Sequence, residues 1–205
     1  MRPFRLAITG DFLNERGEDA YGGLPLHRLE AAPHVEYQFL QDHSPRAGDS
    51  QYWQRFYSLE VSPAHLSVRD GLIVLRPWIK RLALESARAR LVVIGRSGAG
   101  YEKVDVASCT EFDMALFNAP MALNHSTASS ALLFMLALAK RLPEQERLTR
   151  SGRWDLQAAT LGSEIEGRTL GIIGLGHSGR ELVRLAAPFR MRLLAYSPHA
   201  DAATA

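Results

Sequence analysis

The sequence predicts an α/β protein in which parallel strands alternate with helices, and two observations lead to that class. Short apolar runs of strand length recur along the 205 residues, and most are followed by a stretch whose apolar residues have helical spacing. In addition, Gly174, Gly176 and Gly179 follow one such run directly and precede an amphipathic stretch. A strand, a glycine-rich turn and a helix in that order are typical of the start of a βαβ unit.

The first part of the chain alternates regularly as far as residue 118. Strands are expected at 6–9, 35–40, 71–75, 91–94 and 114–117, with helices at 25–32, 81–89 and 104–110. Between them, Trp53, Phe56 and Tyr57 have the spacing of one face of a short helix. That spacing favours packing of the helix, and an aromatic substrate box is the alternative.

The second part begins with the longest helical candidate, residues 126–148, which is apolar nearly all round. Such a helix is expected to be buried on several sides, either between domains or at a subunit interface. A polar loop then leads to a strand at 169–173, the glycine turn, a helix over 181–187 and a strand at 192–196.

Each of the three glycines in the turn is expected to have its own structural role. Gly174 lets the chain turn sharply, Gly176 lets backbone approach a pyrophosphate, and Gly179 lets helix and strand pack closely. The helix that starts near His177 and Ser178 would offer unpaired N–H groups and a positive dipole end to phosphates. The turn therefore predicts a dinucleotide site, with a plain structural turn as the alternative.

Composition narrows the class of protein further. The chain is 46% hydrophobic and 22% charged with a net charge of +2, which favours neither nucleic acid nor a membrane surface as partner. Its single cysteine, Cys109, excludes an internal disulfide. No apolar run approaches the length of a membrane span or signal peptide, so we expect a cytoplasmic protein.

Several separate stretches resemble one family, the D-isomer-specific 2-hydroxyacid dehydrogenases, from about residue 70 to the end. The stretches are Gly95-Arg96-Ser97-Gly98-Ala99-Gly100 with Val104-Asp105, Asn118-Ala119-Pro120, Ser151-Gly152-Arg153-Trp154 and Gly167 to Gly176. The resemblance implies a flavodoxin-like substrate domain over residues 1–118. It implies, over 119–205, the first half of a Rossmann doubly wound NAD(P)-binding domain that includes an interdomain helix at 126–148.

The resemblance also implies an activity, which is hydride transfer between NAD(P)H and a small 2-oxo or 2-hydroxy acid by a homodimer. Ser97, Gly98, Ala99 and Gly100 would face the substrate carboxylate, and Ala99 would also face the cofactor. Arg76 follows a strand and resembles a position near the substrate, with a surface arginine as the alternative. His177 would be a neighbour of the cofactor, together with Gly174, Gly176, Ser178 and Gly179.

Departures from the family pattern leave two questions open. The family's catalytic arginine, carboxylate and histidine would come from beyond Ala205, so no catalytic residue is assigned here. The alternative is a non-catalytic cofactor-binding or scaffold relative; a methyltransferase with a similar glycine turn is disfavoured. Ser197 stands where an acid usually binds the adenosine ribose, so the cofactor is expected to be NAD or NADP. Asp113 replaces a usual glycine at a position where left-handed backbone is expected.

Overall fold

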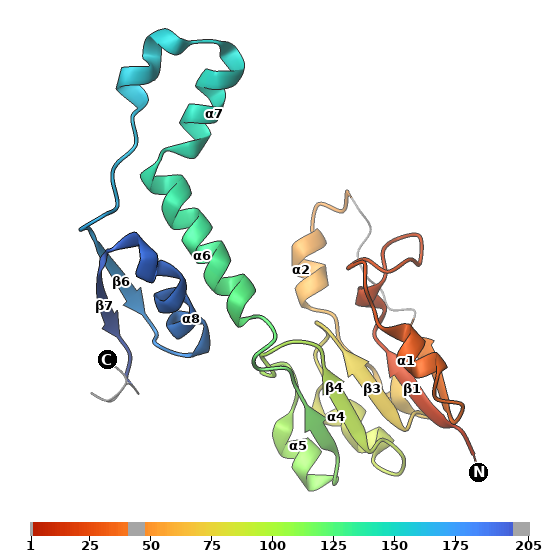
Figure 1. Ribbon diagram of the computed structural model, residues 1–205. Helices are drawn as coiled ribbons and strands as arrows, with labels where there is room; N and C mark the ends of the chain where they lie inside the picture. The colour runs from red at the N-terminus through yellow and green to blue at the C-terminus, as the bar shows by residue number, and fades with distance from the viewer. Residues whose placement is uncertain (1, 41–47, 199–205) are drawn as a thin grey trace. The chain divides into compact units, whose positions relative to one another are not determined.

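The computed structural model describes residues 2–40 and 48–198, and the chain divides into two compact units, Met1–Pro120 and Met121–Ala205 (Figure 1). The strands of the first unit are β1 (Phe4–Ile8), β2 (Val35–Phe39), β3 (Gly71–Val74), β4 (Val93–Arg96) and β5 (Ala115–Phe117). Its helices are α1 (Leu26–Glu30), α2 (Tyr52–Tyr57), α3 (Pro63–Leu66), α4 (Arg81–Ala87) and α5 (Val106–Glu111), with a 3-10 turn at Gly10–Phe12.

The five strands form one parallel sheet in the order β2-β1-β3-β4-β5. This is the strand order of flavodoxin-like doubly wound sheets, in which the order reverses between β1 and β3. The expected α/β fold with parallel strands is therefore confirmed. The left-handed backbone expected at Asp113 is also present, with φ of 55°.

Side chains on the two faces of the sheet build two separate clusters, because successive residues of a strand point to opposite faces. Ala7 of β1 belongs to the larger cluster, which contains Leu66 of α3, Leu84 of α4 and Cys109 of α5. Leu6 and Ile8 belong to the other cluster, against which Leu26 and Leu29 of α1 pack. Helices therefore cover both faces of the sheet, and Cys109 is a buried member of the core.

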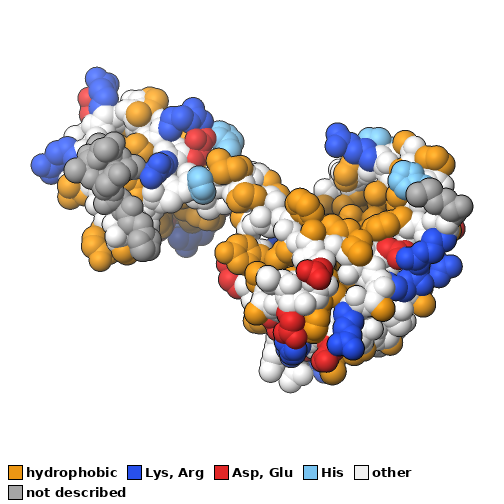
Figure 2. Space-filling view, turned by 90° about the horizontal axis from the view of Figure 1, so that it is seen from below, with side chains coloured by type: hydrophobic (Ala, Val, Ile, Leu, Met, Phe, Trp, Pro, Cys, Tyr) orange, Lys and Arg blue, Asp and Glu red, His pale blue; other side chains and the backbone are white. Residues whose placement is uncertain are grey.

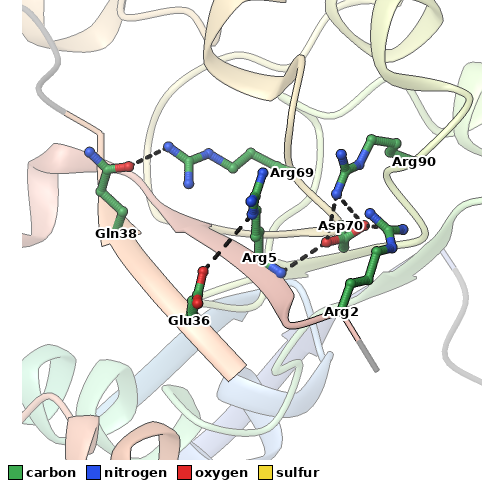
Figure 3. Close-up of polar contacts among 7 residues, drawn as sticks. All are labelled: Arg2, Arg5, Glu36, Gln38, Arg69, Asp70 and Arg90. Carbon is green, nitrogen blue, oxygen red and sulfur yellow. Dashed lines mark hydrogen bonds and ion pairs between the residues drawn. The ribbon is translucent and has the colours of Figure 1, made fainter. Parts of the chain in front are cut away.

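The amino edge of the sheet is held by the buried carboxylate of Asp70 (Figure 3). The backbone N–H of Arg5 donates to Asp70 Oδ2 at 2.9 Å, Arg2 Nη2 donates to Oδ1 at 2.9 Å, and Arg90 Nη2 lies 3.4 Å from Oδ1. Burial alone would raise the pKa of Asp70, but the Arg5 amide and the guanidinium groups of Arg90 and Arg2 outweigh it and lower that pKa. The carboxylate thereby joins β1 to the segments that precede β3 and β4.

Two further contacts at this edge join side chains of neighbouring segments. Arg5 of β1 lies 3.9 Å from the carboxylate of Glu36 of β2, and Arg69 donates to the amide oxygen of Gln38 at 2.5 Å (Figure 3). On the face drawn in Figure 2, Lys and Arg side chains are interspersed with Asp and Glu side chains. This mixture agrees with the small net charge of +2.

The second unit contains α6 (Asn124–Ala139), α7 (Leu142–Ser151), a 3-10 segment (Trp154–Thr160), β6 (Thr169–Ile173), α8 (His177–Ala186), a 3-10 turn (Ala187–Phe189) and β7 (Arg192–Tyr196). β6 and β7 pair in parallel over their whole length, from Thr169 opposite Arg192 to Ile173 opposite Tyr196. Helix α6 packs against α8. The strand, glycine turn, helix and strand expected from the sequence are all present.

The single helix expected at 126–148 is instead two helices. Arg141 has left-handed backbone with φ of 51°, and Pro143, which has no N–H, lies in the first turn of α7. Within the second unit, Ala128 is the buried residue of α6, and Leu138 is 79% exposed. Burial of this segment between domains or at a subunit interface stays a prediction. Throughout residues 2–40 and 48–198, every helix is too short or too polar to cross a bilayer.

Replacing Asp70 with asparagine is expected to lower the free energy of unfolding by about 1–3 kcal/mol, because the two arginines and the Arg5 amide lose their buried, charged acceptor. The pKa of Asp70 is lowered by folding, so its contribution is present above about pH 4 and is lost as the pH falls through the folded value. Urea unfolding between pH 3 and pH 7 measures both effects.

The matched control is Asp155→Asn, because Asp155 pairs with Arg153 on the surface and is 60% exposed. Such a pair contributes little to stability. Equal unfolding midpoints for Asp70→Asn and Asp155→Asn would contradict the role given to Asp70.

Candidate functional site

The carboxyl ends of β1, β3, β4 and β5 lie along one edge of the first sheet, because all five strands are parallel. Ligands of open parallel sheets bind outside this edge, at the point where the strand order reverses. The segments that follow the strands there are Thr9–Asp11 after β1, 75–76 after β3, 97–100 after β4 and Asn118 after β5. We call these segments the carboxyl edge.

A buried carboxylate lies where the strand order reverses. Asp11 Oδ1 accepts a hydrogen bond of 2.6 Å from Thr9 Oγ1, which itself accepts from the N–H of Leu75 at 3.3 Å. Arg76 Nη1 lies 3.8 Å from Asp11 Oδ2. Burial raises the pKa of Asp11, and the Thr9 hydrogen bond and the charge of Arg76 oppose that rise only in part. The ends of β1 and β3 are thus joined around one acid.

Arg76 is held on three sides rather than free at the surface. Its guanidinium donates to the hydroxyl of Tyr21, and its Cζ lies 5.5 Å from the ring centroid of Tyr21 and 4.8 Å from that of Phe56. The side chain is 30% exposed, so part of the guanidinium still faces solvent. The structure therefore presents Arg76 as a fixed cation, which is how a binding group differs from a mobile surface arginine.

The turn after β4 is fixed by hydrogen bonds on both sides. The N–H of Ser97 donates to the carbonyl of Val74 at 2.8 Å, and Asn118 Nδ2 donates to the carbonyl of Ala99 at 2.7 Å. Gly98 has φ of 135°, and a Cβ there would collide with the guanidinium of Arg96.

Two charged side chains accompany this turn. The Arg96 guanidinium contacts the carbonyl of Ser97, and the exposed carboxylate of Glu102 lies over Gly100. The turn is therefore a rigid backbone segment between one cation and one anion.

Lys103 brings a further cation to the same region. Its Nζ donates to the carbonyl of Tyr57 at 3.1 Å and lies 5.4 Å from the ring centroids of both Tyr57 and Trp78. Burial, followed by the charges of Arg76 and Arg96, lowers the pKa of Lys103. The carboxyl edge thus gathers Lys103 with the two arginines.

The glycine turn of the second unit has the geometry expected of it. Gly174 has φ of 96°, and a Cβ at Gly179 would lie 2.2 Å from the carbonyl oxygen of Gly174. A Cβ at Gly176, the residue before α8, would meet nothing within 4 Å. The sharp turn at Gly174 and the close packing at Gly179 are confirmed, and the space beside Gly176 is open.

Other residues of the predicted dinucleotide site surround this turn. His177 is exposed at the first position of α8, and Ser178 Oγ donates to Asn124 Oδ1 at 3.4 Å. Ser197 directly follows β7, whose last carbonyl, that of Tyr196, accepts from the N–H of Gly174 at 2.7 Å. The structure thus groups the predicted cofactor residues of this unit at the carboxyl ends of β6 and β7.

Sequence reasoning missed Asp11 and Lys103. Asp11 lies at the end of β1, and a carboxylate directly after a predicted parallel strand is a signal that could have identified it. Lys103 carries no such signal, because its contacts with Tyr57 and Trp78 arise only in the folded chain. Within the described part of the chain, no three His, Cys, Asp or Glu side chains are grouped to hold a metal ion.

The fold and both glycine turns belong to an α/β protein with parallel strands, and comparison with known proteins gives its family. The model of the D-isomer specific 2-hydroxyacid dehydrogenase NAD binding domain matches residues 132–205. D-3-phosphoglycerate dehydrogenase of Methanocaldococcus jannaschii is 37% identical over 65% of this chain and 24% of that protein. Glyoxylate reductase of Thermococcus onnurineus is 34% identical over 70% of this chain and 46% of that protein.

The chain belongs to the D-isomer specific 2-hydroxyacid dehydrogenase family. It spans between about a quarter and a half of the length of these curated relatives. A similar fold is found in NAD-dependent formate dehydrogenase from Staphylococcus aureus, solved in complex with NAD, with a TM-score of 0.71 and 22% identity. That match covers 96% of this chain and 57% of the other.

Replacing Arg76 with methionine is expected to raise the pKa of Asp11 above its value in the unaltered chain, because the nearby positive charge is lost. A buried carboxyl whose folded pKa is raised costs stability once it ionises, so the variant loses stability as the pH rises through that value. Carbon-detected NMR titration of the Asp11 carboxyl measures the shift. Arg96→Met is the control, and an equal shift in both variants would contradict the assigned pairing.

Proposed function

We propose that this chain supplies the substrate domain and the first half of the Rossmann cofactor domain of an NAD(P)-dependent D-2-hydroxyacid dehydrogenase. The first unit, which corresponds to the substrate domain expected over residues 1–118, would bind a small 2-oxo or 2-hydroxy acid. The second unit would bind the dinucleotide, and the complete protein would be a cytoplasmic homodimer. The observation that carries the proposal is the open space beside Gly176 at the start of α8.

The residues of the second unit fit a pyrophosphate. The first N–H groups of a helix lack intrahelical partners, and α8 begins at His177 directly after Gly176. With no Cβ at Gly176, a phosphate can approach the backbone at the positive end of the helix dipole. Ser197 at the end of β7 would contact the adenosine ribose, where an acid usually stands. A bound nicotinamide cofactor supplies the hydride donor or acceptor.

The residues of the first unit fit an acid. Ser97, Gly98, Ala99 and Gly100 form a backbone turn held by hydrogen bonds; the Ser97 N–H is used by Val74, so the amides of Gly98, Ala99 and Gly100 are the ones that would suit an anionic oxygen. Arg76 adds a fixed guanidinium, which suits the planar carboxylate of such a substrate. Together these groups would bind and orient the substrate.

Proton transfer to or from the substrate oxygen is assigned to none of the described residues. This chain's own residues would contribute binding and orientation, which in enzymes account for a large part of the rate. If the complete protein binds the cofactor but catalyses no reaction, the alternative of a non-catalytic scaffold would be supported.

Replacing Gly176 with valine is expected to weaken NADH binding by about tenfold or more, because losing charge-assisted hydrogen bonds to a phosphate costs about 1.5–3 kcal/mol. The Gly176 backbone is extended and its surroundings are open, so the fold should be kept. Titration of the isotope-labelled chain with NADH, followed at the amides of residues 175–178, measures the affinity.

Gly171→Val is the matched control, because Gly171 lies within β6 and a Cβ there also meets nothing within 4 Å. Valine favours a strand, so this variant should bind NADH as the unaltered chain does. Equal affinities in the unaltered chain, Gly176→Val and Gly171→Val would overturn the cofactor proposal.

Replacing Ser197 with aspartate is expected to shift preference toward NADH over NADPH by about tenfold. The added carboxylate would bind the ribose hydroxyls and repel a 2′-phosphate. The unaltered chain should discriminate weakly between the two cofactors. The measurement is the dissociation constant of NADH and of NADPH for the unaltered chain and for Ser197→Asp. Strict preference of the unaltered chain for NADH would refute the role given to Ser197.

A further inference from the structure

The carboxyl edge of the first unit carries more positive charge than is needed to bind a substrate with a single carboxylate. Arg76, Arg96 and Lys103 gather there, and Arg76 has a carboxylate partner, Asp11 at 3.8 Å. Among the described residues, Arg96 and Lys103 have no acidic side chain within ion-pair distance. At the amino edge, by contrast, Arg2 and Arg90 share the buried carboxylate of Asp70 (Figure 3).

The backbone fixes Lys103 beside the segment that carries Arg76. The N–H of Ile79 donates to the carbonyl of Lys103 at 2.8 Å, and Ile79 and Val104 form a parallel bridge. The two cations lie on adjacent residues of α2, Arg76 over the ring of Phe56 and Lys103 over that of Tyr57. Arg76 and Lys103 therefore lie on neighbouring segments, and both contact α2.

Lys103 keeps hydrogen-bonding capacity that the fold does not use. An ammonium group has three N–H donors, and among the described residues the Nζ of Lys103 has one acceptor, the carbonyl of Tyr57. Lys103 is half-buried, while Tyr57 and Trp78 are 56% and 38% exposed, so the ammonium lies where a ligand can reach it. Burial, and then the charges of Arg76 and Arg96, lower the pKa of Lys103, and the charge of Asp11 opposes that change only in part.

The aromatic side chains of this region contact its cations. Arg76 lies over the rings of Tyr21 and Phe56, and Lys103 lies near the rings of Tyr57 and Trp78. The rings therefore position the cations through cation–π contacts. Glu102, the acid over Gly100, is exposed and leaves the surplus of positive charge in place.

We propose that Lys103 determines substrate specificity by binding a second acidic group, a carboxylate or a phosphate, on the 2-oxo or 2-hydroxy acid. The inference rests on the proposed function of the carboxyl edge and names the class of acid that it takes. The backbone turn at 97–100 and Arg76 would bind the first carboxylate. Lys103 would bind the second group through its unused donors.

Titration of the isotope-labelled chain with three acids tests the proposal: lactate with one carboxylate, tartronate with two, and 3-phosphoglycerate with a carboxylate and a phosphate. The unaltered chain should bind one or both of the last two about fivefold to tenfold more tightly than lactate, the size of one partly exposed charge-assisted contact. Whichever binds more tightly identifies the second group. Amide shifts at residues 97–100 report binding.

Lys103→Gln should abolish the preference while leaving the affinity for lactate unchanged, and Lys103→Arg should retain it. Lys80→Gln is the matched control, because Lys80 pairs with Glu60 at 2.5 Å elsewhere in the same unit. A preference that survives Lys103→Gln would overturn the proposal. So would an equal loss of affinity for all three acids, which would give Lys103 a purely structural role.

The test separates this inference from the proposed function. If the three acids shift the amides of residues 97–100 equally in every form, the substrate site stands and the role of Lys103 is refuted. If none of them shifts those amides, the substrate role of the carboxyl edge fails and the proposal for Lys103 fails with it. The NADH titration of the second unit is independent of both results.

Discussion

The parallel alignment of β1 with both β2 and β3 is the constraint on which the first unit depends. Because each strand runs in the same direction, every segment that leaves a strand does so at the same edge. Asp11, Arg76 and Ser97 are far apart in the sequence, yet each follows the end of a strand. The reversal of strand order between β1 and β3 then places Asp11 and Arg76 side by side. The candidate site is a consequence of the topology before any side chain is considered.

The two edges of this sheet use buried acids in opposite ways. Asp70 at the amino edge receives an amide and two guanidinium groups, and its pKa is lowered, as expected of a structural ion pair. Asp11 at the carboxyl edge receives a hydroxyl and one more distant guanidinium, and burial raises its pKa. A buried carboxylate whose charge is only partly balanced lowers the stability of the fold. Such groups are typical of functional sites, because a network that served stability alone would pair the charge more completely. The contrast supports the proposal that the substrate site of this unit lies at the carboxyl edge.

Much of the fold could be predicted because it rests on local patterns. The apolar runs gave the strands, and the spacing of Gly174, Gly176 and Gly179 gave the turn and the helix after it. The break between α6 and α7 could not be predicted with the same ease, since arginine at position 141 carries no sign of left-handed backbone. The site was predicted only in part: the backbone turns are local, whereas the partners of Asp11 and Lys103 come from distant segments.

Backbone and side-chain groups divide the proposed recognition between them. In the proposed sites, the turns at residues 97–100 and at Gly174 to Gly179 would offer N–H groups, which suit a carboxylate or a pyrophosphate alike. Such groups can be shared by a whole family whose members act on different acids, because a backbone amide does not depend on the side chain it carries. Discrimination would then fall to side chains, which in the proposals are Arg76, Lys103 and Ser197. Since Arg76 and Lys103 are held by contacts with aromatic rings and the Tyr57 carbonyl, either could change without disturbing the backbone of the turns.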